Sequence, residues 1–202
     1  VEMALVQNDI AYYAANGTEM FKDKKVEAIQ GIASLYNETI QIVTIEGKGI
    51  KTVADLKGKR VAVGALGSGT EANARQIMEI FGITYADIKP QYLSFGEAAN
   101  GLKDGNIDVA FVTAGAPTAA IQDIAAQHKV ALVSIPADKA EALIKKYPFY
   151  AKQTIKGKTY PTVEGDVDTV AVKAMLVTSS KVDADLVYKM TKALYGNLDR
   201  MK

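Results

Sequence analysis

Two patterns of apolar residues alternate along the chain. Short aliphatic runs predict strands, at residues 1–6, 60–63, 92–93, 107–112 and 130–135. Apolar residues also fill two pairs of neighbouring runs, 31–36 with 39–45 and 169–172 with 175–178. Between the runs, apolar residues three and four apart predict helices. Strands that alternate with helices indicate an α/β fold with a mainly parallel sheet.

The clearest strand–loop–helix unit lies at residues 60–81. Three glycines and a serine follow the strand within six residues, and the helix carries Ala74, Ile77 and Phe81 on one face. We expect Ser68 or Thr70 to cap this helix. The free N–H groups and the positive dipole end of a helix attract an anion.

The same loop departs from the known phosphate-binding patterns. Thr70 stands where the phosphate loop needs lysine, and the third glycine of the dinucleotide pattern is missing. Glu71 would repel a polyphosphate, so a single carboxylate is the favoured ligand. On spacing alone, an ordinary glycine-rich βα turn explains the stretch equally well.

Two further helices have predicted starts. The first begins at Asn8 or Asp9 and ends near Gly17. Residues 113–116 form a loop, and Pro117 suits the first position of the helix that follows.

Composition excludes several classes of protein. The chain has 202 residues, 49% of them hydrophobic and 23% charged, with a net charge of +1, which fits one large domain or two small lobes. The near-neutral charge and the lack of a basic stripe argue against nucleic acid as a partner. Cysteine is absent, so disulfide and thiol chemistry are excluded, and the single histidine, His128, has no partner for a zinc site. No cofactor is expected.

The sequence pattern of residues 2–8 is repeated at residues 108–114. Each reads acid, apolar, alanine, apolar, valine, polar and small, and each precedes a predicted helix. The repeat suggests two similar lobes with a ligand cleft between them, although a similarity over seven residues can also arise by chance. Because the first residues already read as a strand, we expect a fragment that lacks parts of a longer protein at both ends. Exposed sheet edges would then favour self-association.

The order and spacing of several segments resemble a known family. Residues 55–64, followed by 67–70, resemble the start of the second lobe of type II periplasmic solute-binding proteins. With residues 5–13, 35–39 and 111–118, the chain resembles the TAXI family, the solute receptors of tripartite ATP-independent periplasmic (TRAP) transporters.

The resemblance implies a fold and a function. The fold would be α/β and two-lobed, of the type II periplasmic-binding-protein kind, with an incomplete lobe 1 (residues 1–42 and 170–202) and lobe 2 at residues 43–169. The protein would be a periplasmic receptor that closes on a small organic anion or amino acid, such as glutamate or glutamine, and delivers it to a TRAP membrane permease.

The resemblance also places a ligand site on polar, aromatic and loop residues. The site comprises Gln7, Asn8, Tyr12, Tyr36, Glu38, Ser68, Gly69, Thr70, Asn73, Thr113, Gly115 and Pro117. The two tyrosines would wall the pocket. Residues 68–70 would bind a carboxylate. Glu38 would receive an ammonium group, or it would be a solvated or hinge carboxylate.

Two other functions use the same fold. An enzyme would use Ser68 as nucleophile and the loop amides as an oxyanion hole, but it lacks an evident base because His128 is at the far end of a helix. An effector-sensing domain of a regulator is disfavoured because no DNA-binding segment is visible. No catalytic set is apparent, so a binding protein is the favoured reading.

Overall fold

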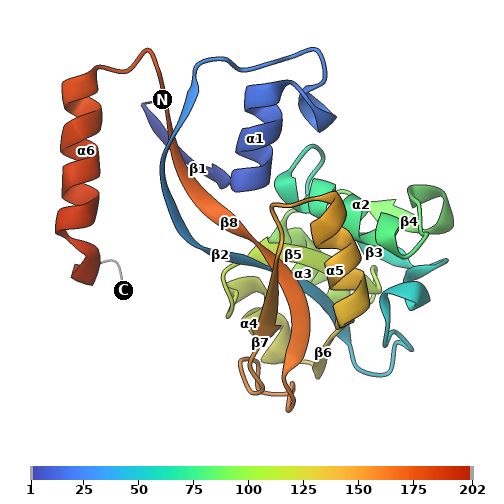
Figure 1. Cartoon of the computed structure of the whole chain (residues 1–202). Helices are drawn as coiled ribbons and strands as arrows, with labels where there is room; N and C mark the ends of the chain where they lie inside the picture. The colour runs from blue at the N-terminus through green and yellow to red at the C-terminus, as the bar shows by residue number, and fades with distance from the viewer. Residues whose placement is uncertain (1, 201–202) are drawn as a thin grey trace. The chain divides into compact units, whose positions relative to one another are not determined.

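The computed structural model describes residues 2–200 and divides into two compact units. Unit 1 comprises Val1–Tyr36 with Lys173–Lys202, and unit 2 comprises Asn37–Val172. Two long strands, β2 (Ile29–Ile45) and β8 (Val167–Ser179), each contribute to both units (Figure 1). The lobes expected from the sequence, 1–42 with 170–202 and 43–169, remain a prediction.

Unit 2 contains a mixed sheet. It has the order β2-β5-β3-β4, with β5 at Val109–Ala114, β3 at Arg60–Ala62 and β4 at Lys89–Gln91. Strand β6 (Val130–Leu132) pairs with β2, and β7 (Ala151–Ile155) pairs with β8. Strand β3 is parallel to β4 and β5, whereas β2 is antiparallel to β5 and β6, and β7 is antiparallel to β8. The expected mainly parallel sheet is therefore wrong, because β2 runs antiparallel to β5 and β6, and β8 runs antiparallel to β7.

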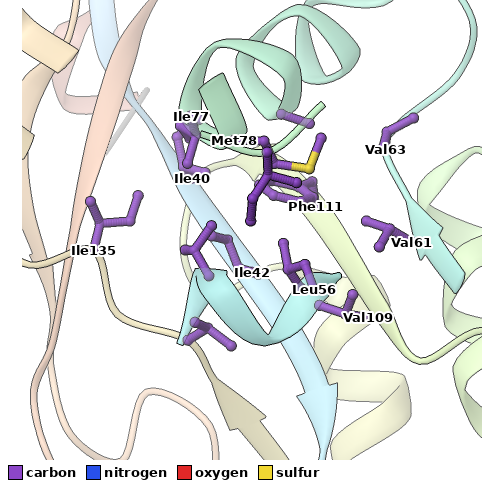
Figure 2. Close-up of a cluster of buried hydrophobic side chains, with 14 of the residues drawn as sticks. Ile40, Ile42, Leu56, Val61, Val63, Ile77, Met78, Val109, Phe111 and Ile135 are labelled. Atoms are coloured by element: carbon purple, nitrogen blue, oxygen red, sulfur yellow. The ribbon is translucent and has the colours of Figure 1, made fainter. Parts of the chain in front are cut away.

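Helices cover both faces of this sheet. The helices α2 (Gly69–Ile80) and α5 (Ala137–Lys146) contribute to one apolar cluster, and α3 (Phe95–Lys103) and α4 (Ala119–Ala125) contribute to the other. Alternate residues of β2, β3 and β5 enter alternate clusters, as a period of two requires. Ile40 and Ile42 pack with Phe111 in the first cluster (Figure 2), whereas Val43 packs in the second.

Short capped turns connect these elements. The 3-10 helices η2 (Val53–Leu56) and η3 (Tyr85–Asp87) each begin with a threonine that shares a capping box with an aspartate. Helix α3 begins in the same way, with Ser94 and Glu97. Each box satisfies backbone N–H groups that a helix start leaves without acceptors.

Unit 1 is built around β1 (Met3–Gln7), which pairs antiparallel with β8. It also contains α1 (Asn8–Asn16), η1 (Glu19–Phe21), α6 (Ala184–Gly196) and η4 (Leu198–Arg200). Helix α1 ends as predicted at Gly17, which has φ +66°. The predicted cap by Asn8 or Asp9 is wrong: Gln7 is the N-cap residue, and Asn8 Oδ1 accepts a hydrogen bond from the Lys173 N–H at 3.0 Å.

Three other local expectations are corrected. The runs 31–36 and 39–45 form one strand, as do 169–172 and 175–178, because a polar residue does not interrupt backbone pairing. The strand expected at 92–93 lies at Lys89–Gln91. Pro117 does not begin a helix: α4 begins at Ala119, because Thr118 is extended (φ −102°, ψ 132°).

Candidate functional site

Eight of the twelve site residues predicted from the sequence lie in unit 2, seven of them on segments at one edge of its sheet. Strands β3 and β5 are parallel neighbours, with Ala62 opposite Ala110, so their carboxyl ends meet at that edge. The loop after β3 leads to Ser68, and the loop after β5 contains Gly115 and Pro117. Glu38 precedes Thr39, which pairs with Ala114, so it lies beside the end of β5. The eighth, Asn73, lies one turn into α2.

The N-terminus of α2 has the predicted serine cap. Ser68 Oγ accepts a hydrogen bond from the Glu71 N–H at 3.2 Å. The N–H groups of Gly69 and Thr70 belong to the first turn, where a helix supplies no acceptor. They are therefore suited to an anionic oxygen.

The Glu71 carboxylate in this first turn is held by a tyrosine. Tyr85 donates its hydroxyl to Glu71 Oε1 at 2.5 Å. Burial and the adjacent Glu71 raise the pKa of Tyr85, so the phenol remains a donor at neutral pH. This hydrogen bond fixes the Glu71 carboxylate beside Tyr85 at the start of α2.

Gly64 lets the backbone pass close to the helix start. It has φ +100°, a conformation that side chains rarely adopt. A Cβ there would lie 2.8 Å from the Thr70 Cβ, and 3.0 Å from both the Glu71 nitrogen and Ser68 Oγ. Glycine is therefore required at this position, for both conformation and space.

A buried polar network connects α2 to the end of β5. Thr113 donates its hydroxyl to Asn73 Oδ1 at 3.2 Å, and Asn73 Nδ2 donates to the Tyr150 hydroxyl at 2.8 Å. Tyr150 in turn donates to Gln76 Oε1 at 2.7 Å. Asn73 is fully buried, so its amide connects the two elements rather than facing solution.

The loop after β5 has an exposed tip. Gly115, Ala116 and Pro117 are exposed, and the peptide bond between Ala116 and Pro117 is cis. Thr118 Oγ1 donates to the Gly115 carbonyl at 2.8 Å, which closes the loop on itself.

Two buried residues hold the same loop from the sheet side. Gln41 Nε2 donates to the Ala114 carbonyl at 3.2 Å and to Thr118 Oγ1 at 2.8 Å. Tyr160 donates its hydroxyl to Gln41 Oε1 and accepts a hydrogen bond from the Thr118 N–H at 2.8 Å. Burial raises the pKa of Tyr160, so this hydroxyl also remains protonated. The sequence analysis did not select these residues, although Gln41 is a polar residue within an apolar run.

The other four predicted site residues lie in unit 1. Gln7 and Asn8 are half-buried at the junction of β1 and α1. Tyr12, on α1, is 50% exposed, and Tyr36, on β2, is 49% exposed. Their participation in the same ligand site remains a prediction.

Two pockets of the structure are lined by none of the twelve predicted site residues. One, of about 230 Å³, is lined in unit 1 by residues that include Met3, Val26 and Val177. Another, of about 270 Å³, is lined in unit 2 by residues that include Lys152, Thr154 and Asp168.

Within residues 2–200, no group of three or more His, Cys, Asp and Glu side chains could hold a metal ion. Over the same range, no helix has both the length and the apolar character that a membrane span requires.

Comparison with known proteins places the chain in a family. The sequence profile of the NMT1-like family matches residues 1–202. The chain belongs to the NMT1-like family. A protein of Escherichia coli (strain K12) named for binding aliphatic sulfonates is 37% identical over 67 residues, which are 33% of this chain and 21% of that protein.

Solved structures confirm the α/β fold of two-lobed periplasmic binding proteins for this NMT1-like chain. The periplasmic aliphatic sulphonate binding protein SsuA from Escherichia coli matches with a TM-score of 0.57 and 17% identity, over 98% of this chain and 52% of SsuA. The substrate binding protein of an amino acid ABC transporter matches with a TM-score of 0.53 and 13% identity, over 99% of this chain and 68% of that protein. The NMT1-like chain thus spans about half the length of SsuA.

Proposed function

We propose that this NMT1-like chain is the solute-binding part of an extracytoplasmic transport receptor for a small organic anion or amino acid. The observation that carries the proposal is the hydrogen bond between Thr113 and Asn73, which ties the end of β5 to the start of α2. It brings two loops together at the carboxyl edge of the sheet, where ligands of open α/β sheets bind. The extracytoplasmic location follows the periplasmic proteins that share this fold.

The polar groups at this edge favour an anionic oxygen. Ser68 supplies a hydroxyl, and Gly69 and Thr70 supply backbone N–H groups at the positive end of α2. The carbonyls of Ala114 and Gly115 accept hydrogen bonds from within the protein. Apart from the carboxylates of Glu38 and Glu71, the edge therefore offers donors, which suit a carboxylate or a sulfonate.

The ligand class has two sources of support. Related structures include binders of aliphatic sulphonates and of amino acids, and both ligand classes carry an oxyanion. An amino acid would add an ammonium group, for which Glu38 is the proposed partner. Glutamate remains our first amino-acid candidate because the TAXI resemblance implies it.

The membrane partner is also a proposal. The resemblance to the TAXI family suggests a TRAP permease, whereas a related structure belongs to an amino acid ABC transporter. Uptake in proteoliposomes with the cognate membrane subunits distinguishes the two, because a TRAP transporter works without ATP. Uptake that stops when ATP is withheld would exclude the TRAP partner.

Calorimetric titration of the whole chain with ethanesulfonate, L-glutamate and L-arginine tests the proposed site. A Cβ at Gly115 would meet nothing within 4 Å, so Gly115→Ala should fold normally. If the solute contacts this tip, the added methyl group should weaken binding about tenfold, which corresponds to roughly 1.4 kcal/mol.

Gly165→Ala is the matched control, because a Cβ there also meets nothing within 4 Å and Gly165 lies in the turn between β7 and β8, outside the loops that follow β3, β4 and β5. Equal affinities for wild type, Gly115→Ala and Gly165→Ala would place the ligand elsewhere. The absence of heat with all three probes at millimolar concentration would refute the proposed anion chemistry.

The proposal includes no catalytic step. The Ser68 hydroxyl caps α2, and the related proteins bind solutes. A bound probe that is released and found chemically unchanged by mass spectrometry supports this view. Conversion of the probe that is lost in Ser68→Ala would instead support the enzyme alternative.

A further inference from the structure

The underside of the loop after β5 carries a set of hydrogen bonds that ordinary loops lack. Four backbone or side-chain groups of residues 114–118 are engaged: the carbonyls of Ala114 and Gly115, and the N–H and hydroxyl of Thr118. Loops generally satisfy their backbone groups with water and are correspondingly mobile. This loop satisfies them with protein groups on one side, while its tip remains exposed.

The groups that hold the loop come from distant parts of the chain. Gln41 and Tyr160 are both fully inaccessible to solvent, and they are joined to each other by a hydrogen bond. Gln41 lies on β2, and Tyr160 follows β7 and packs in the apolar cluster with α3 and α4. Removing one member of such a network lowers the stability of the fold, because water cannot reach the buried groups that are left without a hydrogen-bond partner.

We infer that Tyr160 and Gln41 are positioning residues that preset the loop at residues 113–118 for the solute. This inference rests on the proposed function of that edge. Presetting a loop lowers the ordering cost of binding, so it increases affinity without a direct contact. Both side chains act through Thr118 and Ala114, and the solute would contact only the exposed tip.

The variant Tyr160→Phe tests this role, because it removes one hydroxyl and keeps the ring in place. Its matched control is Thr44→Val, which removes a buried hydroxyl that donates to the Asp108 carbonyl at 2.7 Å, at the opposite end of β5. Hydrogen exchange measured by NMR should show the Thr118 amide exchanging at least a hundredfold faster in Tyr160→Phe, and unchanged in Thr44→Val. Titration with ethanesulfonate and L-glutamate should show about tenfold weaker binding in Tyr160→Phe and less than twofold in Thr44→Val.

A second variant guards against misfolding. Thr118→Ala keeps the bond between Tyr160 and Gln41 but removes the hydroxyl that closes the loop, so it should also weaken binding while the core remains intact. Unchanged protection of the Thr118 amide in Tyr160→Phe would overturn the inference, as would equal losses of affinity in Tyr160→Phe and Thr44→Val. If wild type binds neither probe, the proposed function fails, and the exchange rates alone then decide whether the two residues hold the loop.

Discussion

Gly64 offers a direct test of how the two ends of the β3–α2 loop fit together. The variant Gly64→Ala places a methyl group at φ +100°, 2.8 Å from the Thr70 Cβ and 3.0 Å from the Glu71 nitrogen. The backbone conformation alone costs about 1–2 kcal/mol for a residue with a side chain. Crowding against a fixed backbone adds about 1–3 kcal/mol. The free energy of unfolding should therefore fall by about 2–5 kcal/mol.

Gly67→Ala separates the two contributions. Gly67 also has a positive φ, +73°, but a Cβ there would meet nothing within 4 Å. It should show only the conformational cost of about 1–2 kcal/mol, less a small gain from the stiffer unfolded chain. Urea unfolding followed by circular dichroism measures both variants. Equal destabilisation of the two would refute the crowding between Gly64 and the start of α2.

Three further variants test the start of β5 and the start of α2. In Asp108→Asn, three hydrogen bonds from Arg60 to the carboxylate, at 2.6–3.0 Å, are weakened, and we expect a loss of about 1.5–3 kcal/mol at pH 7 by urea unfolding. Because Arg60 lowers the pKa of Asp108 from 3.8 to about 2, the contribution is complete above about pH 4 and is lost as the pH falls toward 2. A difference from wild type that is the same at pH 7 and pH 2 would contradict this. Ser68→Ala should cost about 0.5–2 kcal/mol through loss of the cap, and Ser68→Gly clearly less; equal losses would show that the hydroxyl does not cap α2.

Several elements could be predicted because their signals are local. The strand, glycines and helix at residues 60–81 follow from apolar spacing, a serine cap and Gly82, and the structure confirms them as β3 and α2. Helix α1 likewise ends at Gly17. The direction of the strands was not predictable in this way, because parallel and antiparallel pairing depends on neighbours far away in the sequence. The alternation rule therefore suggested a parallel sheet, whereas β2 is antiparallel to β5 and β6, and β8 is antiparallel to β7.

The apparent break within β2 coincides with a change in the burial of its residues. The sequence runs divide at Asn37, and the compact units divide at the same residue. Before Asn37, β2 has one buried residue, Ala33, whereas six consecutive residues are buried after Glu38. A strand needs only backbone partners to continue, so a polar residue marks the change of surroundings without ending the strand. The polar interruption at Asn37 therefore indicated a change in burial along β2 and not the end of the strand.

The residues missed by the sequence analysis share a physical reason. Gln41 and Tyr160 are 119 positions apart, and each is unremarkable alone: one is an amide in a strand, the other an aromatic residue in a turn. Their importance comes from burial, because a buried amide without partners would be costly. Gln41, flanked by Ile40 and Ile42, was the available signal, since a polar side chain on the interior of a sheet requires a polar partner. That partner, and the loop which both residues hold, required the tertiary structure.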